Sequence, residues 1–314
     1  MRLCSLLLTL LLPLLGVGCW GLQKTSEPIR KGTGTIGKQN ASDFVAYLNR
    51  QSSYLQTVRY DEVSISASIP GQVVPRLSNS LVVCSKPNNF RMTAALALGG
   101  DQIDVGSNPK EMWMYVKMAK TPYVYCSQSD FPKVQDTLPV KFEPSWVLQA
   151  LGMSTYEPNR DYTVKVNDKD RTYQLSYTDT TATGQQVVKV TDFAADEAFG
   201  GYPQVLKHTV LSADRKTVIA EARVTKVSEH VVGKDPSTKQ NVLVQVPTEL
   251  TLEWPKEKVK MVLLLGRISV NEKMTDDQFL TMFNKPKSIG NATPVNLADY
   301  NSDARTGQSV RGTR

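Results

Sequence analysis

A cysteine that follows an apolar leader is the first candidate for chemistry in this chain. Arg2 precedes an apolar stretch over residues 6–15, which is the composition of a secretory signal. Gly16-Val17-Gly18 and Cys19 come next. Small residues before a cysteine leave its sulfur accessible for a thioether with diacylglycerol, the modification that anchors bacterial lipoproteins. The sequence therefore predicts a lipoprotein-type signal peptide over residues 1–18 and lipidation of Cys19.

Ordinary cleavage is the alternative at this position. The leucine usually found three residues before a lipidated cysteine is replaced by Gly16, and Leu15 lies one residue further back. In that case Cys19 has no role or is removed. If Cys19 is lipidated instead, its acyl chains hold the amino terminus to a membrane while the domain stays in water. We then expect an exported protein of the cell envelope that faces the periplasm. Trp20 stands where some retention signals have Asp, and by that resemblance alone the outer membrane is favoured.

Patterns that would indicate an enzyme or a metal site are missing from the sequence. It contains no Gly-x-Ser-x-Gly, no His-Glu-x-x-His and no paired Cys-x-x-Cys motif. The chain has only two histidines, His208 and His230. Gly32–Lys38 matches a phosphate-binding loop, but no strand precedes it, so we interpret it as linker. We expect no enzymatic activity, no cofactor and no metal.

Two further cysteines, Cys84 and Cys126, lie in strand-like segments of the exported chain. An oxidising compartment would allow a disulfide between them. Two separately buried thiols are the alternative. Because sequence does not fix the distance between the two Cα atoms, both possibilities stay open.

Composition limits the class of protein. Of 314 residues, 40% are hydrophobic and 21% are charged, which is ordinary globular usage. The net charge is +7, with both signs scattered along the chain, so we expect no nucleic-acid binding. After Leu15 no uncharged apolar run approaches the roughly 20 residues of a membrane-spanning helix, which excludes a polytopic membrane protein.

The hydrophobic pattern divides the chain into a tether, a domain and a tail. Residues 19–39 are polar and are interpreted as a flexible tether, and residues 285–314 have the composition of a disordered tail. Residues 40–284 begin with a helix capped by Asn40 and end with a helix whose capping box starts at Thr275. About a dozen short runs between them alternate like strands. Their hairpin-sized spacing predicts a mainly β, α+β fold with one large curved antiparallel sheet or barrel.

Two of these strands are unusually apolar. Residues 112–118 carry apolar side chains on one face and aromatic ones on the other, and residues 261–265 are apolar on both faces. Such strands must be covered on both faces, either by helices or by a bound acyl chain. Core packing against helices is the alternative for each residue. The candidate cavity residues are Met112, Met114, Val116, Leu250, Leu252, Trp254, Met261, Leu263, Phe279 and Phe283.

The order of features over residues 40–284 resembles the periplasmic lipoprotein-carrier and receptor superfamily, which includes LolA, LolB and lipid-carrying lipoproteins. The resemblance rests on pattern, and its pieces are a leading helix at Asn40–Gln51, an extended strand at Thr57–Ile69, the segment Lys86–Met92, Gly106-Ser107-Asn108 leading into Met112–Tyr115, Val246–Leu250, Leu263–Asn271 and the helix at Thr275. It implies an unclosed β-barrel with helices packed in or over its mouth and an apolar cavity for acyl chains.

The resemblance also implies partners. A membrane-anchored protein of this kind would bind a lipid or an acylated lipoprotein as carrier, receptor or chaperone, and the sequence names no protein partner. The alternative is a non-enzymatic structural or sensory protein of the cell envelope whose barrel is filled by its own side chains.

Overall fold

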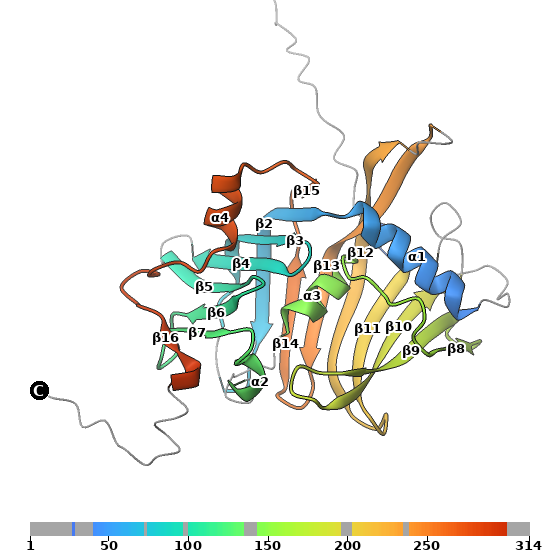
Figure 1. Ribbon diagram of the computed structural model, residues 1–314, viewed down its shortest axis with the longest axis horizontal. Helices are drawn as coiled ribbons and strands as arrows, with labels where there is room; N and C mark the ends of the chain where they lie inside the picture. Colours follow the sequence, from blue (N-terminus) through green and yellow to red (C-terminus); the bar gives the residue numbers. More distant parts are fainter. Residues whose placement is uncertain are drawn as a thin grey trace, which may run out of the picture.

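The computed structural model describes residues 27–28, 40–71, 74–96, 100–134, 143–195, 203–234 and 239–299. Over these residues the chain forms one strongly curved sheet of 16 strands with helices at its faces (Figure 1). The path of neighbouring strands is β16-β7-β6-β5-β4-β3-β2-β14-β13-β12-β11-β10-β9-β8. Its two end strands, β16 and β8, are not paired with each other, so the sheet is not closed into a barrel. The predicted fold class, mainly β with a large curved antiparallel sheet, is confirmed.

Two antiparallel meanders make up the sheet. The first consists of β2 (Thr57–Ser68), β3 (Leu77–Ser85), β4 (Asn89–Leu96), β5 (Gly100–Ser107), β6 (Glu111–Val116) and β7 (Tyr123–Ser127). The second consists of β8 (Tyr162–Asn167), β9 (Thr172–Thr180), β10 (Gln186–Ala194), β11 (Val205–Ser212), β12 (Val218–Lys234), β13 (Asn241–Trp254) and β14 (Val259–Leu264). Pairing of β14 with β2, in which Leu263 lies opposite Ile65, joins the two meanders.

After β14 the chain turns and pairs with β2 a second time through β15 (Ile268–Val270). Gly266 lies at this turn. A Cβ atom at residue 266 would lie 2.7 Å from the carbonyl oxygen of Glu62, so glycine is required for the close approach of the two backbones.

Four helices accompany the sheet: α1 (Ala41–Tyr54), α2 (Phe131–Val134), α3 (Pro144–Ala150) and α4 (Asp276–Phe283). The side chain of Asn40 accepts a hydrogen bond from the backbone N–H of Asp43 at the start of α1. Thr275 and Gln278 form a capping box at the start of α4. Both caps confirm the helix starts predicted from sequence, because these side chains satisfy backbone N–H groups that the first turn leaves free.

Two predicted boundaries change. Residues 27–28 of the predicted tether form β1 (Glu27–Pro28), which pairs with β12. The prediction of disorder from residue 285 is wrong as far as residue 299. There β16 (Val295–Asn296) pairs in parallel with β7, and Ile289 is buried against the aromatic side chains of β6 and β7. The apolar residues of this segment, such as Ile289, are spaced widely among polar ones, so its composition did not predict the packing. The signal peptide, Cys19 and residues 300–314 lie outside the described residues.

Candidate functional site

The concave face of the sheet carries a continuous apolar core where β13 and β14 run side by side. Leu250, Leu252 and Trp254 alternate along β13 and all three side chains are buried. Leu250 lies opposite Leu263 of β14, and Leu252 lies opposite Met261. The period of two along a strand places these side chains on one face. The structure therefore brings four of the ten predicted cavity residues into one core cluster, with Met261 packed against it.

Helix α3 fills the space in front of this face. Trp146, Val147, Leu148 and Ala150 are all buried, and they belong to the same core cluster as Leu250 and Leu263. The rings of Trp146 and Trp254 meet edge to face with centroids 5.5 Å apart. A gap of only about 20 Å³ remains between α3 and β13–β14. The inner apolar face is thus covered by the chain's own helix.

A much larger cavity, of about 790 Å³, opens at the amino end of α3. Its apolar wall is formed by Phe131, Trp146, Leu148, Val187, Val210, Val218, Ile219 and Ala220. Polar and charged side chains also line it, among them Asp179, Lys189, Lys256 and Glu257. The Nζ atom of Lys189 lies 2.8 Å from a carboxylate oxygen of Asp179, so this pair is mutually neutralised. The cavity is therefore lined by both apolar and charged side chains, and Val187 of its apolar lining lies directly opposite Asp179.

The two ends of α3 are held differently. Beyond its carboxyl end, the hydroxyl of Ser52 donates to the carbonyl of Met153 at 3.0 Å. Asn49 accepts from the backbone N–H of Tyr156 and donates to its carbonyl, at 2.7 and 2.8 Å. At the amino end, the cap residue Glu143 makes no side-chain capping hydrogen bond. The carboxyl end of α3 is therefore tied to α1 by hydrogen bonds, and the amino end lies next to the large cavity.

The remaining predicted cavity residues lie at the margin of this core or outside it. Met114 packs against the main cluster and Val116 is half-buried. Met112 belongs to a separate cluster with Cys126, Phe131 and Val134. Met112 pairs with Cys126 of β7, the strand next to the end of the sheet, and therefore lies away from β13 and β14.

Phe279 and Phe283 of α4 pack on the outer face of the sheet. Arg91 of β4 donates to the carbonyls of Thr281 and Met282, both at 3.1 Å. The strand neighbours of Arg91, Phe90 and Met92, are buried in the main core cluster. Since alternate residues of a strand point to opposite faces, α4 lies on the side away from α3. The two phenylalanines therefore do not line the inner face, although the sequence correctly predicted their apolar helix face.

The cysteines are free thiols. Cys84 is buried in the main core cluster, and Cys126 is buried in the small cluster around Met112. Of the two possibilities left open by the sequence, the structure has two separately buried thiols and no disulfide. Strand β3, which carries Cys84, and strand β7, which carries Cys126, are separated by β4, β5 and β6. Burial raises the pKa of Cys84 well above its usual range and that of Cys126 to about 11, so neither thiol ionises readily.

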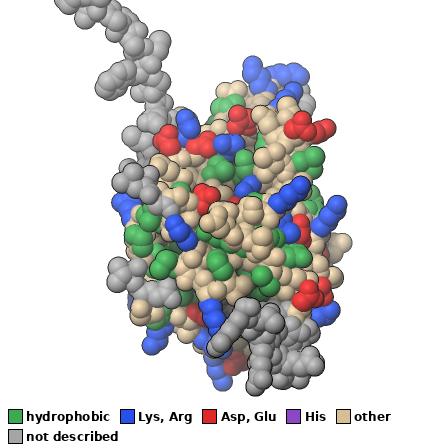
Figure 2. All heavy atoms as spheres, turned by 90° about the vertical axis from the view of Figure 1, so that its left-hand side faces the viewer, with side chains coloured by type: hydrophobic (Ala, Val, Ile, Leu, Met, Phe, Trp, Pro, Cys, Tyr) green, Lys and Arg blue, Asp and Glu red, His purple; other side chains and the backbone are tan. Residues whose placement is uncertain are grey.

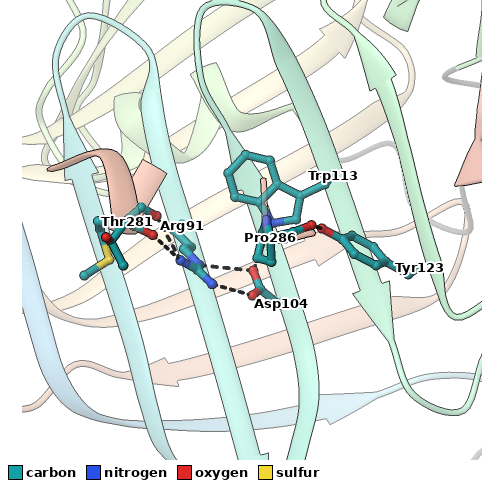
Figure 3. Close-up of polar contacts among 7 residues, drawn as sticks. Arg91, Asp104, Trp113, Tyr123, Thr281 and Pro286 are labelled. Carbon is teal, nitrogen blue, oxygen red and sulfur yellow. Dashed lines mark hydrogen bonds and ion pairs between the residues drawn. The ribbon is translucent and has the colours of Figure 1, made fainter. Parts of the chain in front are cut away.

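On the outer face, four elements meet at one buried ion pair (Figure 3). A guanidinium nitrogen of Arg91 lies 2.8 Å from a carboxylate oxygen of Asp104, and both side chains are largely buried. The indole Nε1 of Trp113 donates to the same carboxylate at 3.0 Å. Nearby, the hydroxyl of Tyr123 donates to the carbonyl of Pro286 at 2.6 Å. The cluster joins β4, β5 and β6 to α4, and sequence reasoning missed it because partners on different strands are set by register.

The surface over this part of the molecule is mixed in charge. Figure 2 shows lysine and arginine side chains interspersed with aspartate and glutamate, with hydrophobic side chains between them. A face of this kind has no extended potential of one sign. The outer cluster is therefore interpreted as a support for α4 and not as an electrostatic binding surface.

A second, smaller cavity of about 50 Å³ lies at the carboxyl end of α3. His208, Gln149 and Gln204 are among its lining residues. Within the described residues, neither polar atom of the buried Gln204 side chain has a hydrogen-bond partner. A polar hollow of this size can accommodate ordered water. His208 is fully buried, its Nδ1 lies 3.1 Å from the hydroxyl of Thr191, and burial lowers its pKa to about 4.

This histidine makes the stability of the protein sensitive to acid. Its pKa is about 4 in the folded chain and near 6.5 in the unfolded chain, so the unfolded chain binds the extra proton first as the pH falls. The free energy of unfolding is therefore expected to fall from pH 6.5 to pH 4. His208→Gln should flatten this fall in urea unfolding measured across that range. His230→Gln, a control on β12, should keep the full slope, and an equal slope in both variants would contradict the assignment.

The described residues offer neither a metal site nor a helix that could span a membrane. No three or more histidine, cysteine, aspartate or glutamate side chains lie together in a way that could hold a metal ion, over the ranges that the structure describes. Within the same ranges, no helix has both the length and the apolar character needed to cross a membrane.

Solved structures of similar fold include proteins of the superfamily that the sequence resembles. A DUF1329 family protein from Desulfovibrio piger has 13% sequence identity over 76% of this chain and 95% of that chain, with a TM-score of 0.48. A LolA superfamily protein from Nitrosomonas europaea has 13% identity, 77% and 97% coverage and a TM-score of 0.42. A putative outer membrane lipoprotein-sorting protein domain from Vibrio parahaemolyticus has 8% identity, 77% and 98% coverage and a TM-score of 0.48.

At these identities the likeness of this chain to the three structures is one of fold alone. No protein-family model matches the chain, and no curated protein matches its sequence.

Proposed function

We propose that this protein is a membrane-anchored lipoprotein of the cell envelope that binds acyl chains of a lipid or of an acylated lipoprotein, as carrier, receptor or chaperone and without enzymatic activity. The observation that carries the proposal is the cavity of about 790 Å³ at the amino end of α3. It adjoins the apolar inner face of an open half-barrel, from which it is separated by Trp146 and Leu148.

The size and the lining of the cavity suit an amphiphile. Pockets that hold small ligands commonly measure roughly 300–1,000 Å³. An acyl chain on the wall of Val187, Val218 and Ile219 would gain about 25 cal/mol for each Å² of apolar surface removed from water. A polar head would find charged partners such as Lys256 and Glu257 in the same cavity. A lining that offers both apolar and charged groups supports an amphiphile over a wholly polar small molecule.

Helix α3 supplies a way to enlarge the site. Within the described residues, the buried indole Nε1 atoms of Trp146 and Trp254 have no hydrogen-bond partner. A buried donor without a partner weakens the closed arrangement. In our proposal the amino end of α3 moves aside, so that an acyl chain in the cavity also contacts Leu250 and Leu263.

Bromine-labelled acyl chains test the position of the ligand. The chain from residue 20 onward, purified without detergent, is titrated with brominated fatty acid or phospholipid while tryptophan fluorescence is recorded. We expect quenching, because Trp146 lines the cavity. Because the ring centroid of Trp254 lies 5.5 Å from that of Trp146, the two substitutions Trp146→Phe and Trp254→Phe together should remove most of the quenching. Trp113→Phe should retain it, because Trp113 lies on the outer face with Asp104 and α4.

Native mass spectrometry of the same preparation provides a measurement without substitution. Additional mass that organic solvent removes would identify the cargo as lipid or acylated peptide. Failure to bind brominated lipid, phospholipid and acylated peptide would overturn the proposal. Equal quenching in the two variants would overturn the assigned cavity while leaving lipid binding intact.

One observation favours a second candidate function. The gap between α3 and β13–β14 is only about 20 Å³, so the inner face is filled by the chain's own side chains. A structural or sensory protein of the envelope would have such a filled barrel. This candidate predicts no bound mass and no quenching in the experiments above.

A further inference from the structure

Strands β12 and β13 extend beyond their neighbours as a two-stranded ribbon, defined here as residues 227–234 and 241–246. β11 pairs with β12 only as far as Arg223, and β14 pairs with β13 only from Glu249 onward. Beyond these points β12 and β13 continue to pair with each other up to Lys234 and Asn241. Figure 1 shows this ribbon projecting past the rest of the sheet.

The ribbon carries an exposed apolar pair near its tip. Val231 lies opposite Leu243, and the two side chains are 57% and 44% exposed. Lys234 and Lys239 lie beyond this pair and are exposed as well. A two-stranded ribbon is only marginally stable in water by itself, and much of the apolar surface of this pair remains in contact with water. The apolar pair and the lysines together suit a surface that is apolar inside and negatively charged outside.

The position of β1 links this tip to the predicted anchor. Glu27 pairs with Val227 and Pro28 with Lys226, in antiparallel orientation. Because the pairing is antiparallel, the amino end of β1 points along the ribbon towards its tip. Eight residue steps separate Glu27 from Cys19 and can span at most about 29 Å. The seven steps from Val227 to Lys234 cover about 23 Å of strand. The anchor and the tip can therefore reach the same plane.

We propose that the tip of the ribbon lies on the lipid bilayer that holds Cys19, with Val231 and Leu243 at the boundary of headgroups and acyl chains and Lys234 and Lys239 among the phosphates. This inference rests on the lipid anchor of the proposed function. A single flexible anchor leaves the orientation of a domain free, whereas a second contact fixes it. The ribbon would therefore set the direction in which the half-barrel faces relative to the membrane.

Depth-dependent quenching tests this surface. The chain from residue 20 onward carries an amino-terminal histidine tag and is bound through nickel-chelating lipid to vesicles of phosphatidylethanolamine and phosphatidylglycerol. An environment-sensitive dye is placed at Leu243→Cys. The matched control is Val166→Cys on β8, a position that is also 44% exposed. Labelling is selective, because Cys84 and Cys126 are buried.

We expect spin-labelled lipid to quench the dye at residue 243 several-fold more strongly than the dye at residue 166. Val231→Asp should reduce the quenching at residue 243 without unfolding the chain, because Val231 is exposed. Equal quenching at the two positions would overturn the proposal, and the ribbon would then be free for a protein partner. The tag replaces the acyl anchor and no cargo is needed, so this result is independent of the cavity experiment.

Discussion

Replacing Asp104 by alanine is expected to lower the free energy of unfolding by about 3–5 kcal/mol, the usual cost of leaving one member of a buried ion pair without its partner. Asp104 neutralises Arg91 at 2.8 Å and accepts a hydrogen bond from Trp113 at 3.0 Å. Without it, a mostly buried guanidinium retains only the carbonyls of Thr281 and Met282 as acceptors. Urea unfolding monitored by circular dichroism measures the change.

Asp101→Ala is the matched control, because Asp101 lies on the same strand and is exposed. A surface change of this kind usually alters stability by less than about 0.5 kcal/mol. Similar losses in both variants would show that the carboxylate of Asp104 does not support the cluster. The expected loss should include a loosening of α4, which hydrogen–deuterium exchange of residues 276–283 would detect.

Replacing Gly106 by alanine is expected to destabilise the protein by an amount at the upper end of the roughly 1–3 kcal/mol that overpacking typically costs. The ring of Trp113 lies directly over Gly106. A Cβ atom there would be 2.0 Å from the nearest ring carbon, far inside van der Waals contact. The ring is fixed by its bond to Asp104, so it cannot move without losing that bond. Thermal and urea unfolding of the variant measure the cost.

A double-mutant cycle separates this clash from other effects. Trp113→Leu removes the ring atoms nearest to residue 106, so Gly106→Ala in that background should cost much less than in the natural chain. An unchanged cost would mean that alanine acts through the backbone of β5 and not through the ring.

Local signals in the sequence were sufficient to predict the starts of α1 and α4 and the class of the fold. Asn40 and Thr275 have side chains that cap the backbone within three residues, so their roles depend on no distant partner. The alternation of Leu250, Leu252 and Trp254 likewise places them on one face of a single strand. Features of this kind follow from the geometry of one segment.

Partners across strands could not be predicted in this way. The contact of Arg91 with Asp104, and of Trp113 with Gly106, depends on the register of three strands. The apolar face of α4 was visible in Phe279 and Phe283, but the sequence does not say which surface of the sheet that face covers. Nor does it show that Met112 packs near the edge of the sheet. The candidate cavity was missed, since its wall is assembled from loops and strand ends far apart in the chain.

Pairing of β2 with β14 also has a consequence for the order of folding. Ile65 and Leu263 meet across this seam although almost two hundred residues separate them. Contacts of such long range close slowly, because the entropy of a large loop must be lost before they form. When the chain emerges amino end first, β2 has an unpaired edge until nearly the whole domain has followed. During that interval the first meander is exposed to aggregation, so the newly made chain would benefit from a chaperone that covers this edge.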